Sequence, residues 1–288
     1  MSGSDPAAGT TPHCYRHPDR ETYITCQRCG RSICPNCMRQ ASVGFQCPDC
    51  VRQGTSESRQ GRTAFGGRLH PGSFVATYTL IAINVVFFAL AHISDQFWST
   101  MILLPDASFP QQIAGIDGVY QGSYWQLITS TFLHYQIFHI GLNMIGLWLF
   151  GRFAEMQLGR WRFVSLYLVC GFIGSVVTYW FGPLSSGTLG ASGSIFGLFG
   201  AVLVVLLKRH GDVTQLLILL ALNLVITFTV PDISWQAHIG GLVSGLVLGY
   251  AFAYSPRRLQ VPVHVGAVAG LVVLGIVLTI LRTANLSG

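Results

Sequence analysis

The 288-residue sequence has few charged residues: only 10% are Asp, Glu, Lys or Arg, while 51% are hydrophobic. Soluble globular proteins carry about 25% charged residues, because their surfaces must be hydrated. The composition therefore argues against a soluble enzyme. Within the apolar part of the chain, acidic residues stand only at the ends of apolar segments and in one long loop. This scarcity argues against an ion or proton pump that depends on intramembrane carboxylates.

Three amino-terminal stretches also lack long apolar runs. Residues 1–13 have no apolar core of the kind found in a cleavable signal peptide, and we expect a disordered tail there. Residues 14–52 hold seven of the eight cysteines and predict a small separate domain. Residues 53–72 are polar and rich in Gly, Ser and Arg, which is typical of a flexible linker.

Apolar segments recur through the remainder of the chain. About 20 residues suffice to cross a ~30 Å hydrocarbon core as a helix. We predict seven spans, at residues 73–93, 135–153, 161–181, 190–207, 213–230, 235–254 and 262–281. The connection 94–134 is longer and mixed, which predicts a partly embedded interfacial loop. The predicted fold class is an all-α polytopic membrane protein preceded by a small domain.

The basic residues orient these spans. Nine of the 17 Lys and Arg residues lie within the first 68 positions, and none occurs from residue 69 to 151. Seven others follow the second, fourth and sixth spans: Arg152, Arg160, Arg162, Lys208, Arg209, Arg257 and Arg258. Only Arg282 falls on the opposite side. By the positive-inside rule, we expect a cytoplasmic amino terminus and an outside carboxyl terminus. The expected location is the plasma (cell) membrane.

Four polar residues stand in the first turns of the spans that run from outside to inside. His139 and Asn143 share a face of the second span, Ser192 begins the fourth, and His238 begins the sixth. Polar residues are costly in hydrocarbon and are functional candidates there. All four lie at a similar shallow depth, which a water-filled cavity open to the outside could reach.

Small residues on the fourth and sixth spans predict that these two helices pack closely. They recur every four positions and include the helix-packing candidates Gly193, Gly197, Gly241 and Gly245. Such stripes let two helix backbones approach each other. Close packing is what a Ser192–His238 hydrogen bond of about 2.6–3.2 Å requires. No acidic residue is predicted nearby, so the pattern indicates a dyad.

The same residues carry a resemblance to the rhomboid intramembrane serine proteases. The matching runs are Gly190–Gly193, Ala237–Gly241, and Phe132–His134 followed by His139 and Asn143. The resemblance covers residues 73–254 and implies a six-helix protease core. Residues 255–288 then form a seventh transmembrane helix and a tail.

The resemblance implies a role for each of these residues. Ser192 is expected to be the nucleophile, and His238 the general base and then the general acid. His139, Asn143 and the backbone N–H of Ser192 are expected to form the oxyanion hole. No cofactor is expected to be required for catalysis. The chain departs from the family at Gln126, where many members carry Arg, and this puts the packing of the long loop in question.

The cysteine-rich domain predicts two structural zinc sites. Its eight candidate ligands form four two-residue-spaced pairs: Cys14, His17, Cys26, Cys29, Cys34, Cys37, Cys47 and Cys50. Disulfides are the alternative, but cytoplasmic thiols stay reduced. The pattern resembles a B-box-type zinc finger, which implies that the first and third pairs share one ion and the second and fourth the other. Sequential pairing of the ligands remains open.

Two classes of function follow. The first is an intramembrane serine endopeptidase that hydrolyses peptide bonds in or near transmembrane helices of membrane-protein substrates. The second is a non-proteolytic rhomboid-like protein that binds membrane clients while the zinc module recruits cytoplasmic factors. Retention of both Ser192 and His238 favours the protease. The expected partners are transmembrane substrates, the lipid bilayer and a cytoplasmic protein that binds the zinc module, while nucleic acid is disfavoured.

Overall fold

The computed structural model describes residues 11–57, 63, 65–67, 74–107 and 117–287. The chain divides into two compact units, Met1–Gln60 and Gly61–Gly288, and each is described by itself. Most of the tail predicted at residues 1–13 lies outside the described residues. Its last residue already belongs to the first strand, β1, which spans His13–Cys14.

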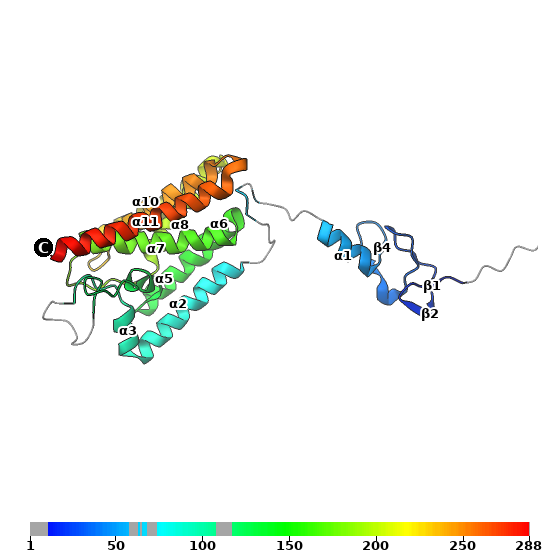
Figure 1. Cartoon of the computed structure of the whole chain (residues 1–288), viewed down its shortest axis with the longest axis horizontal. Coiled ribbons are helices and arrows are strands. Elements are labelled where there is room, and N and C mark those ends of the chain that lie inside the picture. The colour runs from blue at the N-terminus through cyan, green and yellow to red at the C-terminus, as the bar shows by residue number, and fades with distance from the viewer. Residues whose placement is uncertain (1–10, 58–62, 64, 68–73, 108–116, 288) are drawn as a thin grey trace, which may run out of the picture. The chain divides into compact units, whose positions relative to one another are not determined.

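The first unit is a small module of short strands and turns that ends in one helix (Figure 1). It contains β1 and β2 (His17–Glu21), the 3-10 turn η1 (Pro35–Cys37), β3 (Arg39–Gln40), β4 (Phe45–Gln46) and helix α1 (Pro48–Glu57). The strands pair antiparallel as β1–β2 and β3–β4. The buried apolar cluster consists of six cysteines and Ile33. So small a cluster cannot supply the burial that a stable domain needs, so the module depends on cross-links of another kind.

The second unit is helical, and its long helices run side by side in Figure 1. The helices are α2 (Val75–Ile93), α3 (Asp95–Met101), α4 (Gln126–Thr129), α5 (Ile137–Gly146), α6 (Arg152–Leu158), α7 (Arg160–Phe181), α8 (Ser192–Lys208), α9 (Thr214–Thr229), α10 (Trp235–Tyr254) and α11 (Gln260–Ser287). Short turns of other helical types are η2 (Ser130–Phe132), η3 (Leu147–Gly151) and η4 (Arg257–Leu259). The π-helical η3 joins α5 and α6 into one continuous span.

Five of these helical segments are long and apolar enough to cross a membrane: Val75–Ile93, Ile137–Leu158, Arg160–Phe181, Trp235–Tyr254 and Arg257–Ser287. The shorter apolar helices α8 and α9 fall at the two other predicted spans. The predicted all-α membrane body is therefore confirmed. Helix α7 is central, because 67% of its apolar window is buried, against 22% for α2. The outer helices leave apolar side chains exposed, as lipid contact allows.

Helices α8 and α10 approach each other at backbone distance. A Cβ placed on Gly241 would overlap the carbonyl oxygen of Gly193, and one on Gly245 would overlap the carbonyl oxygen of Gly197. The small-residue stripes predicted from the sequence therefore face each other. Lipid tails are as apolar as the helices, so this van der Waals contact replaces the hydrophobic drive of a soluble core.

Glu155 is a buried carboxylate on α6 that contacts the start of α2 as well as Arg160. Its carboxylate accepts hydrogen bonds from the backbone N–H of Ala76 at 3.1 Å and of Thr77 at 2.9 Å, and from the Thr77 hydroxyl at 2.8 Å. Arg160 also lies 3.4 Å from it. The first N–H groups of a helix have no partner within the helix, and a carboxylate there also complements the helix dipole. Glu155 thereby fastens the start of α2 to α6.

Nine residues of the predicted linker at 53–72 lie within the described ranges, 53–57, 63 and 65–67. Helix α1 continues to Glu57, and Phe65 is buried in the main apolar cluster of the second unit. A Cβ on Gly67 would lie 2.5 Å from the carbonyl oxygen of Leu158. The chain before α2 is therefore held against the loop between α6 and α7, while most other residues of the expected linker lie outside the described ranges.

We expect Gly245→Ala to destabilise the membrane body, because the added methyl overlaps the α8 backbone. Overpacking of this kind costs about 1–3 kcal/mol, which should lower the thermal unfolding midpoint in detergent by several degrees. Gly270→Ala is the matched control, because a Cβ on Gly270 in α11 meets nothing within 4 Å. Equal midpoints for the two variants would contradict the contact.

Candidate active site and metal centres

Ser192 is the first residue of α8, and the two residues before it are held in place by polar contacts. The N–H of Gly190 donates to the carbonyl of Ser130 at 2.9 Å. The N–H of Ala191 donates to Nε2 of His134 at 3.3 Å. Because Ser192 begins the helix, its own N–H belongs to the first turn, where N–H groups have no partner within the helix and point toward an anion.

Gly190 is the position where only glycine fits. Its φ is +124°, a backbone conformation that L side chains rarely adopt. A Cβ there would lie 2.7 Å from Cε1 and Nε2 of His139 and 3.9 Å from the Ser192 hydroxyl oxygen. The imidazole of His139 and the Ser192 hydroxyl therefore both lie against the Gly190 backbone, on the same side of the bundle.

His238 is the fourth residue of α10, where the cap of the helix sets the first turn. Ser234 is the N-cap and its hydroxyl accepts from the N–H of Ala237. Nε2 of His238 lies 2.7 Å from Oγ of Ser192. The ring of Phe196 stacks on the imidazole at 4.2 Å with 12° between planes. His238 is 7% exposed, so the imidazole is held on one face by an aromatic ring and at one nitrogen by serine.

The predicted oxyanion-hole residues lie on α5. His139 is partly exposed and packs edge-on against His134, with ring centroids 5.0 Å apart. Asn143 is buried one turn below, where its side-chain amide donates to the carbonyl of His139 at 2.9 Å. The amide carries a second N–H. The structure thus brings His139 beside Ser192 and places Asn143 one turn deeper on the same helix face.

His134 links the backbone of two segments through its two ring nitrogens. It is fully buried; Nδ1 lies 3.3 Å from the carbonyl of Phe132, while Nε2 accepts from Ala191. A neutral imidazole has one donor and one acceptor nitrogen, and here both have a partner.

The sequence left the effect of Gln126 on the long loop open, and it gave no sign of the role of Thr227. The Gln126 amide is fully buried; its oxygen accepts from the N–H of Leu104 at 3.0 Å and its nitrogen donates to the carbonyl of Asp117 at 2.8 Å. Gln126 therefore holds the long loop together by neutral hydrogen bonds.

The Thr227 hydroxyl of α9 lies 2.6 Å from Nδ1 of His238. Threonine in an apolar helix gives no signal in sequence, because its hydroxyl can bond its own helix.

The eight metal-ligand candidates gather into two groups of four. One group is Cys14, His17, Cys34 and Cys37, and the other is Cys26, Cys29, Cys47 and Cys50. Within each group all ligand atoms lie within 4.8 Å of one another. This is the alternating grouping that the B-box resemblance implies, and the sequential grouping is not what the structure forms. None of the eight cysteines, all of which lie in the described residues, forms a disulfide.

The spacing of the ligand atoms fits a tetrahedral ion. His17 Nδ1 lies 3.7, 3.4 and 3.4 Å from the sulfurs of Cys14, Cys34 and Cys37. In the second group the sulfurs of Cys29 and Cys47 are 3.8 Å apart. Thiolates about 2.3 Å from one tetrahedral zinc ion stand about 3.8 Å apart. Both groups are therefore shaped to hold a metal ion with four protein ligands and no open position.

Hydrogen-bond donors point at three of the four sulfurs of the second group. Backbone N–H groups point at two of its sulfurs, from Cys47 to Cys26 at 3.2 Å and from Cys50 to Cys47 at 3.3 Å. The guanidinium of Arg31 donates to Cys29 at 3.3 Å and lowers the pKa of that thiol to about 6. Ligand thiolates stabilised in this way are typical of metal centres with an ordered outer shell.

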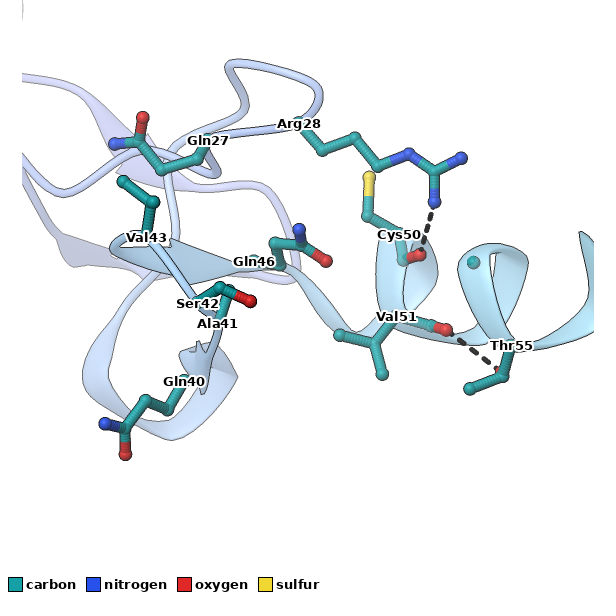
Figure 2. A pocket seen from close by; sticks show the side chains of 11 residues that line it. Gln27, Arg28, Gln40, Ala41, Ser42, Val43, Gln46, Cys50, Val51 and Thr55 are labelled. Carbon is teal, nitrogen blue, oxygen red and sulfur yellow. Dashed lines mark hydrogen bonds between the residues drawn. The ribbon is translucent and has the colours of Figure 1, made fainter. Parts of the chain in front are cut away.

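A groove of about 650 Å³ lies on the module beside the second group (Figure 2). One side is the β3–β4 turn, with Ala41, Ser42 and Val43, and the other is α1, through Cys50, Val51, Gly54 and Thr55. Arg28 donates to the carbonyl of Cys50 at 3.0 Å. This bond ties one end of the groove to α1, the helix that carries the ligand candidate Cys50. The groove is therefore shaped by residues that also order the ligands.

Fold and site together define a polytopic membrane protein with a serine–histidine pair near the ends of its helices. Residues 121–255 match the family model of the rhomboid domain. The chain is 31% identical over 211 residues to Rhomboid protease GluP of Bacillus subtilis, covering 69% of this chain and 40% of that protein. It is 36% identical over 146 residues to Putative rhomboid protease YdcA of the same organism, covering 49% of this chain and 73% of that protein.

A more distant organism supplies a further match. RHOMBOID-like protein 1 of Arabidopsis thaliana is 34% identical over 146 residues, which cover 48% of this chain and 37% of that protein. The chain thus spans well under two thirds of some of the curated relatives it matches. The extent and identity of these matches show that the chain belongs to the rhomboid family.

We expect each chain to bind two metal ions. Cys50→Ser should lower the metal content to about one ion per chain by elemental analysis, because it removes one ligand of the second group. Cys170→Ala is the matched control, because this buried cysteine belongs to the membrane body and to neither group. Deletion of residues 1–52 should lower the content to about zero. An unchanged metal content in Cys50→Ser would contradict the assignment.

Proposed function

We propose that the protein is an intramembrane serine endopeptidase that cleaves membrane-protein substrates in or near their transmembrane helices. The observation that carries this proposal is the 2.7 Å contact between Ser192 Oγ and His238 Nε2 in a chain of the rhomboid family. Two of its relatives carry the name rhomboid protease. A hydroxyl is a weak nucleophile until an adjacent base takes its proton, and this contact supplies that base.

The first chemical step forms the acyl-enzyme. Ser192 Oγ attacks the peptide carbonyl carbon while its proton passes to Nε2 of His238, and the carbonyl π electrons move onto the oxygen. When the tetrahedral intermediate collapses, the C–N bond breaks and His238 returns the proton to the leaving nitrogen. A water molecule then passes a proton to Nε2 of His238 as its oxygen attacks the ester carbonyl. The C–Oγ bond breaks, and His238 returns the proton to Ser192 Oγ.

The developing oxyanion needs donors that are already in place. The backbone N–H of Ser192 is one, because it lies in the first turn of α8, where the helix dipole favours negative charge. His139 lies beside the same backbone segment and is the second. Asn143 is the third, through the amide N–H that its bond to the His139 carbonyl leaves over. Removing one such donor typically costs about 10²–10³ in rate.

The module is proposed to bind two structural zinc ions. Seven thiolates and one imidazole are the ligand set that zinc prefers, and four protein ligands at each ion leave no position for catalytic water. The ions supply cross-links in a unit whose buried apolar cluster is small. A cytoplasmic protein is the proposed partner of the module, with the groove beside α1 as its contact surface.

The protein is an integral membrane protein, and we propose the plasma membrane with the amino terminus in the cytoplasm. The basic residues support this orientation. They cluster where α6 meets α7, where α8 ends and where α10 meets α11, and Arg282 near the end of α11 is the exception. This orientation puts the start of α8 and α10, and with them Ser192 and His238, near the outer surface.

Cleavage of a model transmembrane substrate by purified protein tests the dyad. Wild type should cleave, whereas Ser192→Ala and His238→Ala should lose at least about 10³-fold in rate, because nucleophile and base act as a unit. A fluorophosphonate should label wild type at Ser192. Equal cleavage by all three proteins, or an adduct at another residue, would exclude the dyad and favour client binding without proteolysis.

Labelling in intact cells tests the orientation. A membrane-impermeant maleimide should label Ser185→Cys, which is exposed between α7 and α8, above the level of the unsubstituted protein. It should label Arg258→Cys, exposed between α10 and α11, only after the cells are permeabilised. The reverse pattern would invert the proposed topology.

A further inference from the structure

Thr227 is a buried polar residue on a helix with few buried residues. Of the residues of α9, only Leu216, Leu220 and Thr227 are buried. Thr227 is 3% exposed, and its hydroxyl lies 2.6 Å from Nδ1 of His238. We propose that Thr227 is a positioning residue that holds His238 in the tautomer required of a general base. The proposal rests on the protease function proposed above.

We assign the hydroxyl proton of Thr227 to the neighbour that can only accept, the carbonyl of Asn223. A threonine hydroxyl has one proton to donate and lone pairs to accept. Thr227 Oγ1 donates its proton to the carbonyl of Asn223 at 2.7 Å. Toward His238 it can then only accept, so the proton between them belongs to Nδ1 of the imidazole. The hydroxyl is therefore an acceptor fixed by its own helix.

The position of this proton determines whether Nε2 presents a lone pair or an N–H to Ser192. A neutral imidazole carries one N–H, and if it is on Nδ1, then Nε2 presents a lone pair. Nε2 lies 2.7 Å from Ser192 Oγ, so the serine hydroxyl donates to it, which is the starting arrangement for proton transfer. In the other tautomer an N–H would face the serine and no base would be available. A third group that selects the tautomer is what a triad acid supplies elsewhere.

Thr227 also acts during the reaction. When Nε2 takes the proton from Ser192, the imidazole becomes positive and its Nδ1–H becomes a stronger donor. The Thr227 oxygen, polarised by its bond to Asn223, continues to accept that proton. In the structure the ring stacks on Phe196, which also restricts its orientation. Thr227 lies on α9 and His238 on α10. The position of α9 against α10 therefore determines whether His238 carries its proton on Nδ1.

A neighbouring threonine supplies a matched control. Thr229 lies on the same helix, and its hydroxyl donates to the carbonyl of Val225 at 2.7 Å, as Thr227 does to Asn223. Thr229 is exposed. Loss of either hydroxyl removes one back-bond to the helix, whereas only loss of the Thr227 hydroxyl removes the acceptor for His238.

Steady-state cleavage of a model transmembrane substrate by the full-length protein tests the proposal. Thr227→Val keeps the shape of the side chain and should lower kcat by roughly 10- to 100-fold with little change in KM, because a misprotonated base affects only chemistry. Thr227→Ser restores the hydroxyl and should recover most of the rate. Thr229→Val should behave as wild type.

A spectroscopic measurement reads the tautomer directly. In protein with 15N-labelled histidine, the His238 ring signals are identified by their loss in His238→Ala. In wild type they should report a protonated Nδ1, and in Thr227→Val they should move toward a tautomer mixture or toward protonated Nε2. This readout needs no substrate.

The outcomes separate the two proposals. Wild-type kcat in Thr227→Val, with an inactive Ser192→Ala, would overturn the role of Thr227 and leave the protease intact. Equal losses in Thr227→Val and Thr227→Ser, with unchanged His238 signals, would mean that the residue only packs. Wild-type protein without Ser192-dependent cleavage would overturn the protease, while the 15N spectra would still decide the tautomer.

Discussion

The backbone contact between α8 and α10 is the constraint on which the candidate site depends. At Gly193 against Gly241, and one turn deeper at Gly197 against Gly245, the two helices leave no room for a methyl group. Ser192 and His238 stand in the first turns of these same helices, so the helix separation sets the distance between Oγ and Nε2. Lipid provides no hydrophobic drive to bring helices together, and glycine provides the close approach that dispersion forces need.

Hydrogen bonds of buried polar side chains fix the helix ends, in addition to the glycine contacts between α8 and α10. Within hydrocarbon, an unpaired polar group costs several kcal/mol, so each polar side chain there must find a partner. His134 pairs with the backbone just before Ser192, and Glu155 pairs with the first N–H groups of α2. These bonds join segments that are distant in sequence. The polar residues of the body thus orient the backbone at the ends of helices, where the site is built.

Most of the architecture was predictable from the sequence, because each membrane span must be a continuous run of apolar residues. Span positions follow from runs of apolar residues, and the metal-ligand candidates follow from pairs of cysteines. The positions of Ser192 and His238 were predictable from resemblance and helix depth. The contacts of Glu155 with Thr77 and of Thr227 with His238 were not, since each joins different helices and neither leaves a periodic signal. Threonine is ordinary in an apolar helix, so only the structure distinguishes Thr227 from Thr229.

The two units differ in what stabilises their folds. The membrane body has an extensive apolar cluster, so glycine contacts and buried hydrogen bonds suffice to fix its geometry. The amino-terminal module buries little beyond its cysteines and Ile33, so its ligand clusters take the place of a core. Ser192, His238, His139 and Asn143 all lie in the body, and every metal-ligand candidate lies in the module. Each unit therefore builds its candidate site from its own residues, so we expect metal removal to unfold the module without changing the geometry of the dyad.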